Sequence, residues 1–305
     1  MLLENFRHAE STLCRDRLFS LLGLASDGNE SAFEPDCESP LEDVVLKFAR
    51  VFVRQGRGMQ LLYRAGLSSP RFPSWIPDWT VKRPSSLSDA SEGGMLFSAS
   101  GPQQSKIKCI PDTDELAVEG YQVDVIESIS ESSNLEQEWP SYFREVDEMV
   151  DSLGMSPFPC SARDLKWKVP IACAEYPNGA VSGGLDMESS YTVLRRYLVE
   201  RTAVDDSCSS KVKACSSNYV AVLQDRVKGW RFVVTEKGYT GIVPPGARKG
   251  DIVAILKGGR VPFILQKGEE RPEAFRLAGE CYVHGIMNGE GLSLYEVLER
   301  EFRIF

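Results

Sequence analysis

A short row of polar side chains lies near the C-terminus, in the segment Glu280-Cys281-Tyr282-Val283-His284. Because side chains alternate between the two faces of a strand, an extended conformation places Glu280, Tyr282 and His284 on the same face. A carboxylate, a phenol and an imidazole in a row can orient a polar substrate or move a proton. A hydrogen-bonded row that only stabilises the fold uses the same residues, so both interpretations stay open.

The same alternation argues against a thiol–imidazole pair between Cys281 and His284. An offset of three residues along a strand points the two side chains to opposite faces, unless a bulge intervenes. We therefore take Tyr282 and His284 as candidate catalytic groups and leave Cys281 out.

Arg231 is the third candidate catalytic residue, because its guanidinium could polarise a carbonyl group. The candidate substrate-binding residues are Trp75, Trp79, Trp230, Tyr239 and Glu280. Trp75 and Trp79 belong to the proline-rich extended segment 70–84, where two indoles either clamp a ligand or cap the core. Tyr239 lies between two glycines and is either a turn anchor or a lid over a ligand.

The element that must position these residues is the stretch 229–292, in which short β-branched and aromatic runs alternate with Gly and Pro. That pattern is typical of a small barrel or meander. The pair Gly258-Gly259 suits a two-residue hairpin turn that follows a strand at 251–257. This strand is apolar on both faces, which predicts cover on both sides. Pro262 cannot donate a ladder hydrogen bond and favours an edge position or a bulge.

Helical periodicity predicts the other half of the fold. The expected helices are one within 13–28 that ends at Gly23 or just beyond, one from Pro40 to near Gly56 or Gly58, 139–153, 191–204 and a last one over 294–305. Further strands are expected at 95–99, 106–110 and 115–129. Ser39 and Glu42 form a predicted capping box at the start of the second helix, with Pro40 at its first position.

Together these elements predict an α+β fold, with N-terminal helices and a helical middle packed around a β-rich body that ends in a small barrel or meander. We expect residues 1–305 to form one compact unit. Its expected subregions are helical at 1–70, β-rich at 71–130, helical with loops at 131–215, and barrel-like with a C-terminal helix at 216–305.

Composition narrows the function classes. A net charge of -9 argues against sequence-independent binding of nucleic acid, which needs a basic surface. Only two histidines occur, His8 and His284, so we expect no histidine-built metal site, and no motif points to a cofactor. No apolar run reaches the roughly 18 residues of a membrane span. Eight cysteines without a C-x-x-C pair, and early charges at the N-terminus, favour a cytoplasmic protein with reduced thiols.

Several phrases resemble the fungal heterokaryon-incompatibility (HET-domain) proteins. They are RDRLFSLLGLASD at 15–27, FEPDCESPLEDVVLKFARVFV at 33–53, PSWIPDWT at 73–80, FSAS at 97–100, the run 232–265, and GECYVHGIMNGEGL at 279–292. The resemblance implies a filamentous fungal source and covers the C-terminal region of that family. In the family, an effector domain precedes the helix that contains Arg15 and Arg17 here. We therefore expect that domain to be absent, and its cell-death activity is not carried over.

Two functional hypotheses follow. The favoured one is a stand-alone, cofactor-independent cyclase that performs a Diels–Alderase-type cycloaddition on a hydrophobic small molecule in fungal secondary metabolism. Such a reaction needs mainly a dry pocket that holds a near-attack conformer, and this positioning can contribute roughly 7–11 kcal/mol. The alternative is a non-catalytic recognition or regulatory module derived from a heterokaryon-incompatibility protein. The oligomeric state stays open.

Overall fold

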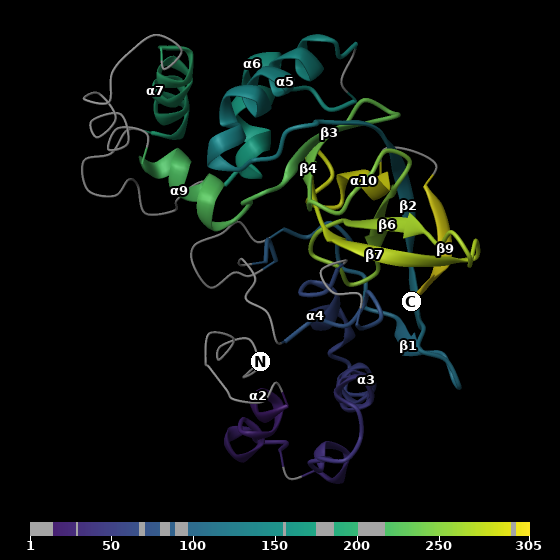
Figure 1. Cartoon of the computed structure of the whole chain (residues 1–305). Coiled ribbons are helices and arrows are strands. Elements are labelled where there is room, and N and C mark those ends of the chain that lie inside the picture. Colours follow the sequence, from purple (N-terminus) through teal and green to yellow (C-terminus); the bar gives the residue numbers. More distant parts are fainter. Residues whose placement is uncertain are drawn as a thin grey trace.

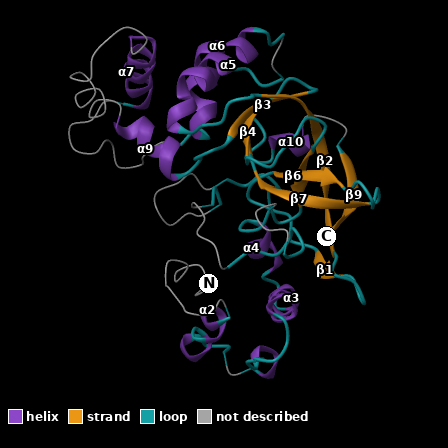
Figure 2. Cartoon of the chain, in the orientation of Figure 1, coloured by secondary structure: helices purple, strands orange, loops and turns teal. Residues whose placement is uncertain are grey.

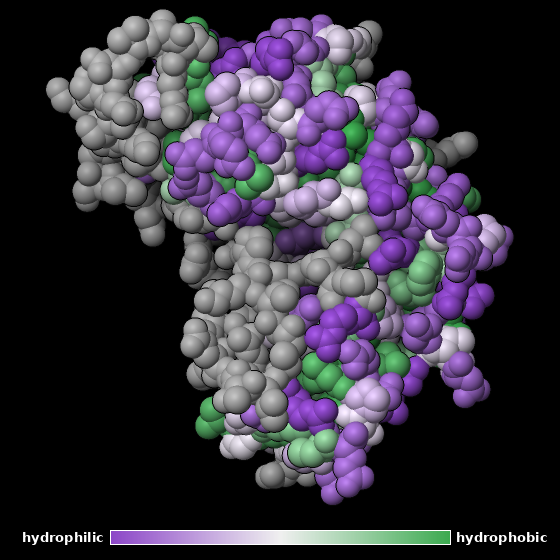
Figure 3. Space-filling model, in the orientation of Figure 1, coloured by the Kyte–Doolittle hydropathy of each residue, from purple (hydrophilic) through white to green (hydrophobic). Residues whose placement is uncertain are grey.

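The structure is a computed structural model, and it describes residues 15–28, 30–66, 71–79, 86–88, 97–154, 157–174, 186–200, 217–293 and 297–305. Within these ranges it has helices and a large mixed sheet, which confirms the predicted α+β class (Figure 1). No helix in the described ranges is long and apolar enough to cross a membrane. In Figure 3 the hydrophobic side chains on the visible described surface form small groups separated by hydrophilic ones.

The N-terminal helices are short except for one. They are α2 (Asp16–Phe19), the 3-10 turns Leu22–Leu24 and Ser31–Phe33, α3 (Leu41–Arg54) and α4 (Gly58–Leu62). In α3 the predicted apolar stripe, which includes Val44, Phe48 and Phe52, is buried. The predicted capping box is wrong, because Pro40 is the N-cap residue and no side chain caps this helix. The helix predicted within 13–28, ending at Gly23 or just beyond, is not continuous over its described part, where α2 and a separate 3-10 turn replace it.

The helical middle comprises α5 (Trp139–Asp151), α6 (Ala162–Lys168), the 3-10 turn Val169–Ile171, α7 (Met187–Glu200) and α9 (Ser217–Asp225). The helix predicted at 139–153 is therefore confirmed. The one predicted at 191–204 corresponds to α7, which begins four residues earlier. Figure 1 shows these helices on one side of the sheet, above β3 and β4, while α3 and α4 lie at the opposite end.

The sheet has the strand order β5-β6-β7-β9-β2-β3-β4-β8, and β1 pairs with β2 (Figure 2). The strands are β1 (Ile107–Cys109), β2 (Leu116–Ile129), β3 (Arg231–Thr235), β4 (Thr240–Val243), β5 (Ile252–Leu256), β6 (Phe263–Lys267), β7 (Ala274–Glu280), β8 (Tyr282–Val283) and β9 (Leu298–Ile304). The strands predicted at 106–110 and 115–129 correspond to β1 and β2. The strand predicted at 95–99 is wrong where it is described, since residues 97–99 are not extended into a ladder.

The long strand β2 organises the sheet. It pairs with β9 through Leu116–Gln122, with β5 through Gly120–Val125 and with β3 through Ile126–Ile129. Because β5 also pairs with β6, β6 with β7, and β7 with β9, the strands β2, β5, β6, β7 and β9 form a closed ring of paired strands.

Alternating side chains divide the sheet between two hydrophobic cores. In β5, Ile252, Ala254 and Leu256 belong to the larger core, which also contains the buried face of α3. Val253 and Ile255 belong to the second core. All five side chains are buried, which confirms the prediction that this strand is covered on both sides.

The turn predicted at Gly258-Gly259 is not a two-residue hairpin. The β5–β6 register ends at Ala254 and Phe263, so residues 255–262 separate the last paired positions of the two strands. Gly258 has a positive φ of 80°, and a Cβ there would come within 2.6 Å of the Ser105 backbone nitrogen. Pro262 precedes β6, which is paired on both sides, and the β6–β7 register shifts between Ile264 and Leu265. Of the two predicted positions, an edge or a bulge, the structure therefore has the bulge.

The C-terminal segment is a strand where a helix was predicted. Only the short helix α10 (Glu290–Ser293) precedes it, and the last residues form β9. In β9, Phe302 and Ile304 are buried while Glu301 and Arg303 are more exposed, which is the two-residue period of a strand. The apolar residues of this segment fit both the helical period and the strand period, and pairing with β2 selects the strand.

Candidate functional site

Tyr282 and His284 lie together, as the strand alternation predicts. The Tyr282 hydroxyl and His284 Nδ1 are 2.8 Å apart and share a hydrogen bond. Tyr282 is buried in the larger core, whereas Cys281 and Val283 belong to the second core, which confirms that they point to opposite faces. The strand is held in register through Ile242 of β4, which is the partner of Tyr282. We call Tyr282, His284 and the side chains around them, defined below, the Tyr282–His284 cluster.

Phe158 covers the imidazole. Its ring meets the His284 ring edge to face, with centroids 5.3 Å apart and an interplanar angle of 87°. Phe158 also packs on Gly285, where an added Cβ would lie 2.6 Å from Phe158 Cγ. Gly285 has a φ of 89°, so both its conformation and the closeness of Phe158 require glycine. The backbone N–H of His284 donates to the Thr240 carbonyl at 2.8 Å, which fixes the residue against β4.

The second wall of the cluster comes from α6 and the 3-10 turn after it. Ser161 caps α6 by accepting a hydrogen bond from the Asp164 backbone N–H at 3.0 Å. The turn that follows packs against β4. It ends with Ala172 and Cys173 both in the left-handed region, at φ of 52° and 54°. Because neither residue is a glycine, the left-handed conformation stores backbone strain of about 1–2 kcal/mol at each of them.

Cys173 joins the cluster through the tyrosine. The Cys173 side chain adds to the effect of burial in raising the pKa of Tyr282. The backbone N–H of Cys173 donates to the Lys168 carbonyl at 2.8 Å, which closes the end of the helix. Cys160 lies near the same group of side chains, and both residues are partly buried thiols packed against the larger core.

Charged side chains surround the pair. On α6, Lys168 and Asp164 form an ion pair at 3.3 Å. Burial lowers the pKa of His284, and the positive charge of Lys168 lowers it further, while Asp164 and Glu290 act in the opposite direction. Burial also raises the pKa of Tyr282 well above its usual value. The imidazole is therefore neutral and the phenol protonated at neutral pH.

This arrangement limits where the protons lie. In the hydrogen bond between the Tyr282 hydroxyl and His284 Nδ1, one group donates and the other accepts. If Tyr282 donates to His284 Nδ1, the imidazole proton is on Nε2 and can be given to a carbonyl oxygen. If Tyr282 accepts instead, Nδ1 carries the imidazole proton. Either way the pair can hold and transfer a proton between a phenol and an imidazole.

Glu280 does not join this pair. Its carboxylate accepts hydrogen bonds from the Ser86 hydroxyl at 2.8 Å and from the Leu87 backbone N–H at 2.6 Å. The chain leaves β7 at Glu280 and enters β8 at Tyr282, so the row is interrupted between two strands. Glu280 thus holds the segment 86–88 against the sheet.

Arg231 lies on β3 and faces away from the cluster. Its Nε donates to the Ser130 carbonyl at 2.6 Å. The neighbouring residue Phe232 is paired with Ile242, and Ile242 with Tyr282, so these three side chains share one face and Arg231 takes the other.

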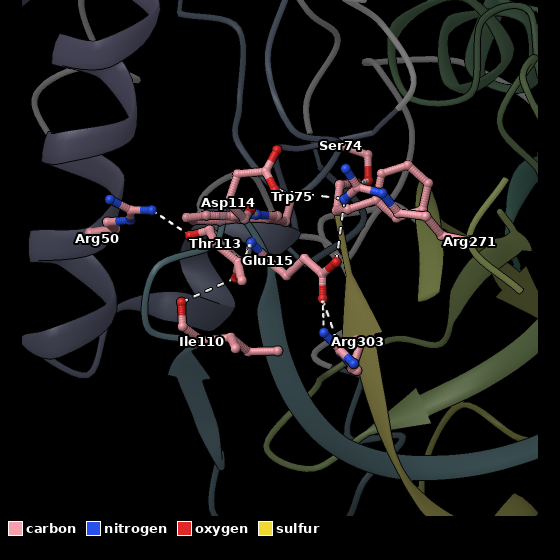
Figure 4. Close-up of polar contacts among 10 residues, drawn as sticks. Arg50, Ser74, Trp75, Ile110, Thr113, Asp114, Glu115, Arg271 and Arg303 are labelled. Atoms are coloured by element: carbon pink, nitrogen blue, oxygen red, sulfur yellow. Dashed lines mark hydrogen bonds and ion pairs between the residues drawn. The ribbon is translucent and has the colours of Figure 1, made fainter. Parts of the chain in front are cut away.

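The candidate tryptophans belong to the larger core, and Trp75 and Trp79 make contacts there with residues other than Tyr282 and His284. Trp75 is fully buried and its indole N–H donates to the Asp114 carbonyl at 2.8 Å (Figure 4). Trp79 packs edge-on against Phe52 at 6.2 Å, and its indole N–H has no hydrogen-bond partner in the described part of the chain. The carbonyl of Trp230 accepts from the Asn134 backbone N–H at 2.7 Å.

Tyr239 belongs to the second core and anchors the β3–β4 turn, where its backbone N–H donates to Thr235 Oγ1 at 3.0 Å. The sequence-predicted site residues therefore separate into one assembled pair, Tyr282 with His284, and several residues that pack or bond elsewhere.

The residues that sequence reasoning missed are Phe158, Cys160, Asp164, Lys168 and Cys173. They come from a segment more than a hundred positions before His284, and local spacing gives no signal that it meets β8. Among the described residues no group of three or more His, Cys, Asp or Glu side chains is arranged to hold a metal ion.

Comparison with known proteins shows which proteins the chain resembles. Residues 184–302 match the Het-6 beta-barrel domain, a range that includes β3 to β8 and most of β9. Over 94% of its length the chain is 24% identical to "Heterokaryon incompatibility protein 6, OR allele" of Neurospora crassa, and the match covers 50% of that protein. The chain thus spans about half the length of this curated relative. No solved structure matches the chain. The chain therefore carries a region that matches the Het-6 beta-barrel domain, and over most of its length it is similar to a fungal heterokaryon-incompatibility protein.

Proposed function

We propose that this chain binds a hydrophobic small molecule with a carbonyl group at the Tyr282–His284 cluster and promotes its cyclisation without a cofactor, as a Diels–Alderase-type enzyme of fungal secondary metabolism. The observation that carries the proposal is the 2.8 Å hydrogen bond between Tyr282 and a partly buried, neutral His284. A neutral imidazole fixed by a second hydrogen bond is a suitable donor to a carbonyl oxygen.

Polarising a carbonyl makes an attached alkene more reactive toward a diene in the same molecule. No proton, electron or cofactor has to be exchanged in such a cycloaddition, so the protein needs only to orient the substrate and to donate one hydrogen bond. Orientation alone can lower the barrier by about 7–11 kcal/mol. Phe158 and Phe97, which contact His284 and Tyr282 respectively, would supply apolar surface next to the carbonyl.

Arg231, Trp75 and Trp79 give the proposal no support, since their polar groups or rings are engaged elsewhere. This makes Arg231 a useful control. Purified chain is incubated with linear polyene substrates that contain a diene and an α,β-unsaturated carbonyl, and cyclised products are separated by chromatography and mass spectrometry. The proposal expects product above the buffer blank, a loss of at least tenfold in His284→Ala, and little change in Arg231→Ala. Rates equal to the blank for substrates made by neighbouring biosynthetic genes would contradict it.

A second candidate function is a non-catalytic recognition module in heterokaryon incompatibility. The observation that favours it is the match across 94% of the chain to a protein whose name describes that process and an allele of it. The test is to express the chain in one partner of a heterokaryon. The other partner carries different alleles of the gene that encodes this chain. Growth arrest confined to particular allele pairs would support this function. Growth that does not depend on the allele would exclude it.

A further inference from the structure

We infer that the outer edge of β9, over residues 298–302, docks an extended segment of another protein, which adds to the sheet as a further antiparallel strand. This surface is separate from the cyclisation site proposed above, because β2, β3 and β4 lie between β9 and the strand that holds Tyr282. Figure 1 shows β9 at the outer side of the sheet, next to β2.

Most of the outer edge of β9 has no neighbouring strand. On one side β9 pairs with β2 along its whole length, from Leu298 to Ile304. On the other side its partner is β7, and that pairing covers only Arg303 and Ile304. Residues 298–302 therefore form an open edge among the described strands. Leu298 has 61% of its surface exposed, so this edge is accessible.

The ladder between β2 and β9 determines where the backbone groups of this edge point. In β2, the Glu119 N–H donates to the Lys106 carbonyl at 3.2 Å, and the Glu119 carbonyl accepts from the Lys257 N–H at 3.0 Å. Both bonds lie on the side of β1 and β5, away from β9. Glu119 is opposite Glu301, so Glu301 also directs its own N–H and carbonyl away from β2. Glu299, two residues earlier, does the same.

These outward groups have the spacing that an added strand requires. No hydrogen bond outside the sheet joins the backbone N–H or carbonyl of Glu299 or Glu301 to another group in the described part of the chain. In an antiparallel pair, such residues exchange both backbone bonds with the residue opposite, at every second position. An extended peptide uses these bonds when it adds to an exposed sheet edge.

Arg300 gives the edge its preference for a partner of particular charge. Its guanidinium lies over the rings of Phe275 and Phe302, at 5.1 and 5.2 Å from their centroids, and no carboxylate of the described residues forms an ion pair with it. In the added pair, Arg300 takes a position without mutual backbone bonds, where opposite side chains are closest. An acidic side chain opposite Arg300 would therefore complement this edge.

The same charges argue against a second copy of this chain as the occupant. The register that pairs the whole edge of two copies has its twofold axis at Arg300, so the two copies of Arg300 lie opposite each other. The glutamates 299 and 301 of one copy also lie opposite those of the other. Like charges in such positions destabilise a strand pair. Within one chain the glutamates already pair with Lys257 and Lys108, so they leave Arg300 as the group that selects the partner.

The test measures binding of a capped, fluorescent pentapeptide to the full chain by fluorescence anisotropy. The peptide contains valine, threonine, glutamate, threonine and valine in that order, so that its glutamate lies opposite Arg300 and its threonines lie opposite Glu301 and Glu299. Two matched control peptides carry backbone N-methyl groups, one on both threonines and the other on the glutamate. Only the threonine N–H groups face the edge. We therefore expect methylated threonines to lower the affinity about tenfold or more, and a methylated glutamate to leave it nearly unchanged.

Variants of the chain test the same bonds from the other side. Glu301→Pro removes an outward N–H and leaves the ladder to β2 intact, because proline is accepted in an edge strand where its nitrogen faces solvent. It should lower the affinity for the unmodified pentapeptide about tenfold, whereas Glu301→Gln, which keeps the N–H, should not. Arg300→Glu should weaken binding about threefold, and a lysine in place of the peptide's glutamate should restore it.

Urea denaturation shows whether each variant is folded, and if Glu301→Pro does not fold, the comparison rests on the two methylated peptides. Absence of peptide binding, equal affinities of the two methylated peptides, or unchanged affinity in folded Glu301→Pro overturns the inference. A dimer that Glu301→Pro converts to a monomer, without peptide binding, would assign the edge to a second copy and overturns it as well. The cyclisation assay is independent, because none of these substitutions changes Tyr282 or His284.

Discussion

The carboxylate of Glu115 accepts two charged hydrogen bonds from Arg303, at 2.9 Å to its Nε and 2.7 Å to its second guanidinium nitrogen, although the two residues are 188 positions apart. Glu115 is nearly fully buried, and Arg271 reaches its other oxygen at 3.3 Å. Figure 4 shows this contact beside the turn that receives the Trp75 indole. The contact fixes the entry to β2 against the last strand of the chain.

Removing this carboxylate should therefore destabilise the fold. We expect Glu115→Gln to lower the free energy of unfolding by about 2 kcal/mol, which is in the range for hydrogen bonds to charged groups. Solvent screens the interaction in part, because the guanidinium group of Arg303 is about half exposed. Urea denaturation measures this change. Glu301→Gln on the same strand is the control, because its partner Lys108 is mostly exposed and surface pairs contribute at most about 1 kcal/mol. Equal losses of unfolding free energy in Glu115→Gln and Glu301→Gln would contradict the structural role assigned to Glu115.

Gly285→Ala should destabilise the protein through two separate effects. The left-handed conformation costs an alanine about 1–2 kcal/mol, and the added methyl group would overlap Phe158 at 2.6 Å. A double-mutant cycle with Phe158→Ala separates them. The loss in unfolding free energy should be smaller in the Phe158→Ala background, leaving only the backbone cost. Identical losses in both backgrounds would show that Phe158 does not press on Gly285.

Protonation of His284 should weaken the folded state. Its pKa is lowered by burial and by Lys168 from an ordinary value of 6.5. The unfolded chain therefore binds more protons between the two pKa values, and stability falls as the pH drops below about 6.5 toward the folded value. Lys168→Gln should raise the pKa of His284, as measured by NMR titration. A titration of His284 above 6.5 in the unmodified chain would be inconsistent with this direction.

Asn134 should be among the most sensitive buried polar positions. Its side-chain amide donates to the Leu223 and Val227 carbonyls, each at 3.3 Å, and accepts from the Trp139 indole at 2.8 Å. Asn134→Ala leaves buried groups without partners, each worth about 1–3 kcal/mol. Thermal unfolding should show clearly lower stability for Asn134→Ala, whereas Asn288→Ala at an exposed position should change the stability little. A small effect at Asn134 would mean that water replaces the amide.

The sequence predicted the pairing of Tyr282 with His284 because that relationship depends only on the two-residue period of an extended chain. It also predicted the covered strand at 252–256, where apolar residues occupy both faces. Glu280 could not be placed in this way, since the chain changes strands after it and its partners lie near residue 87.

Other features depend on contacts between distant segments. The run Leu298–Ile304 fits a helix or a strand, and only the presence of β2 beside it selects the strand. The left-handed conformation of Ala172 and Cys173 could not be predicted from residue type, because neither residue is a glycine or an asparagine. Cys173 lies near Tyr282 only because the turn after α6 packs on β4. Neither propensity nor periodicity contains that information.

The ring of paired strands has a consequence for how the chain can be divided. Strand β2 lies outside the segment that matches the Het-6 beta-barrel domain, yet it supplies hydrogen-bonding partners to β3, β5 and β9. A fragment that starts at residue 184 would leave those strands with open edges, which invite association with other copies. Assembly of the ring must therefore wait until segments almost 190 residues apart have met, and slow, concentration-sensitive refolding follows from that long-range closure.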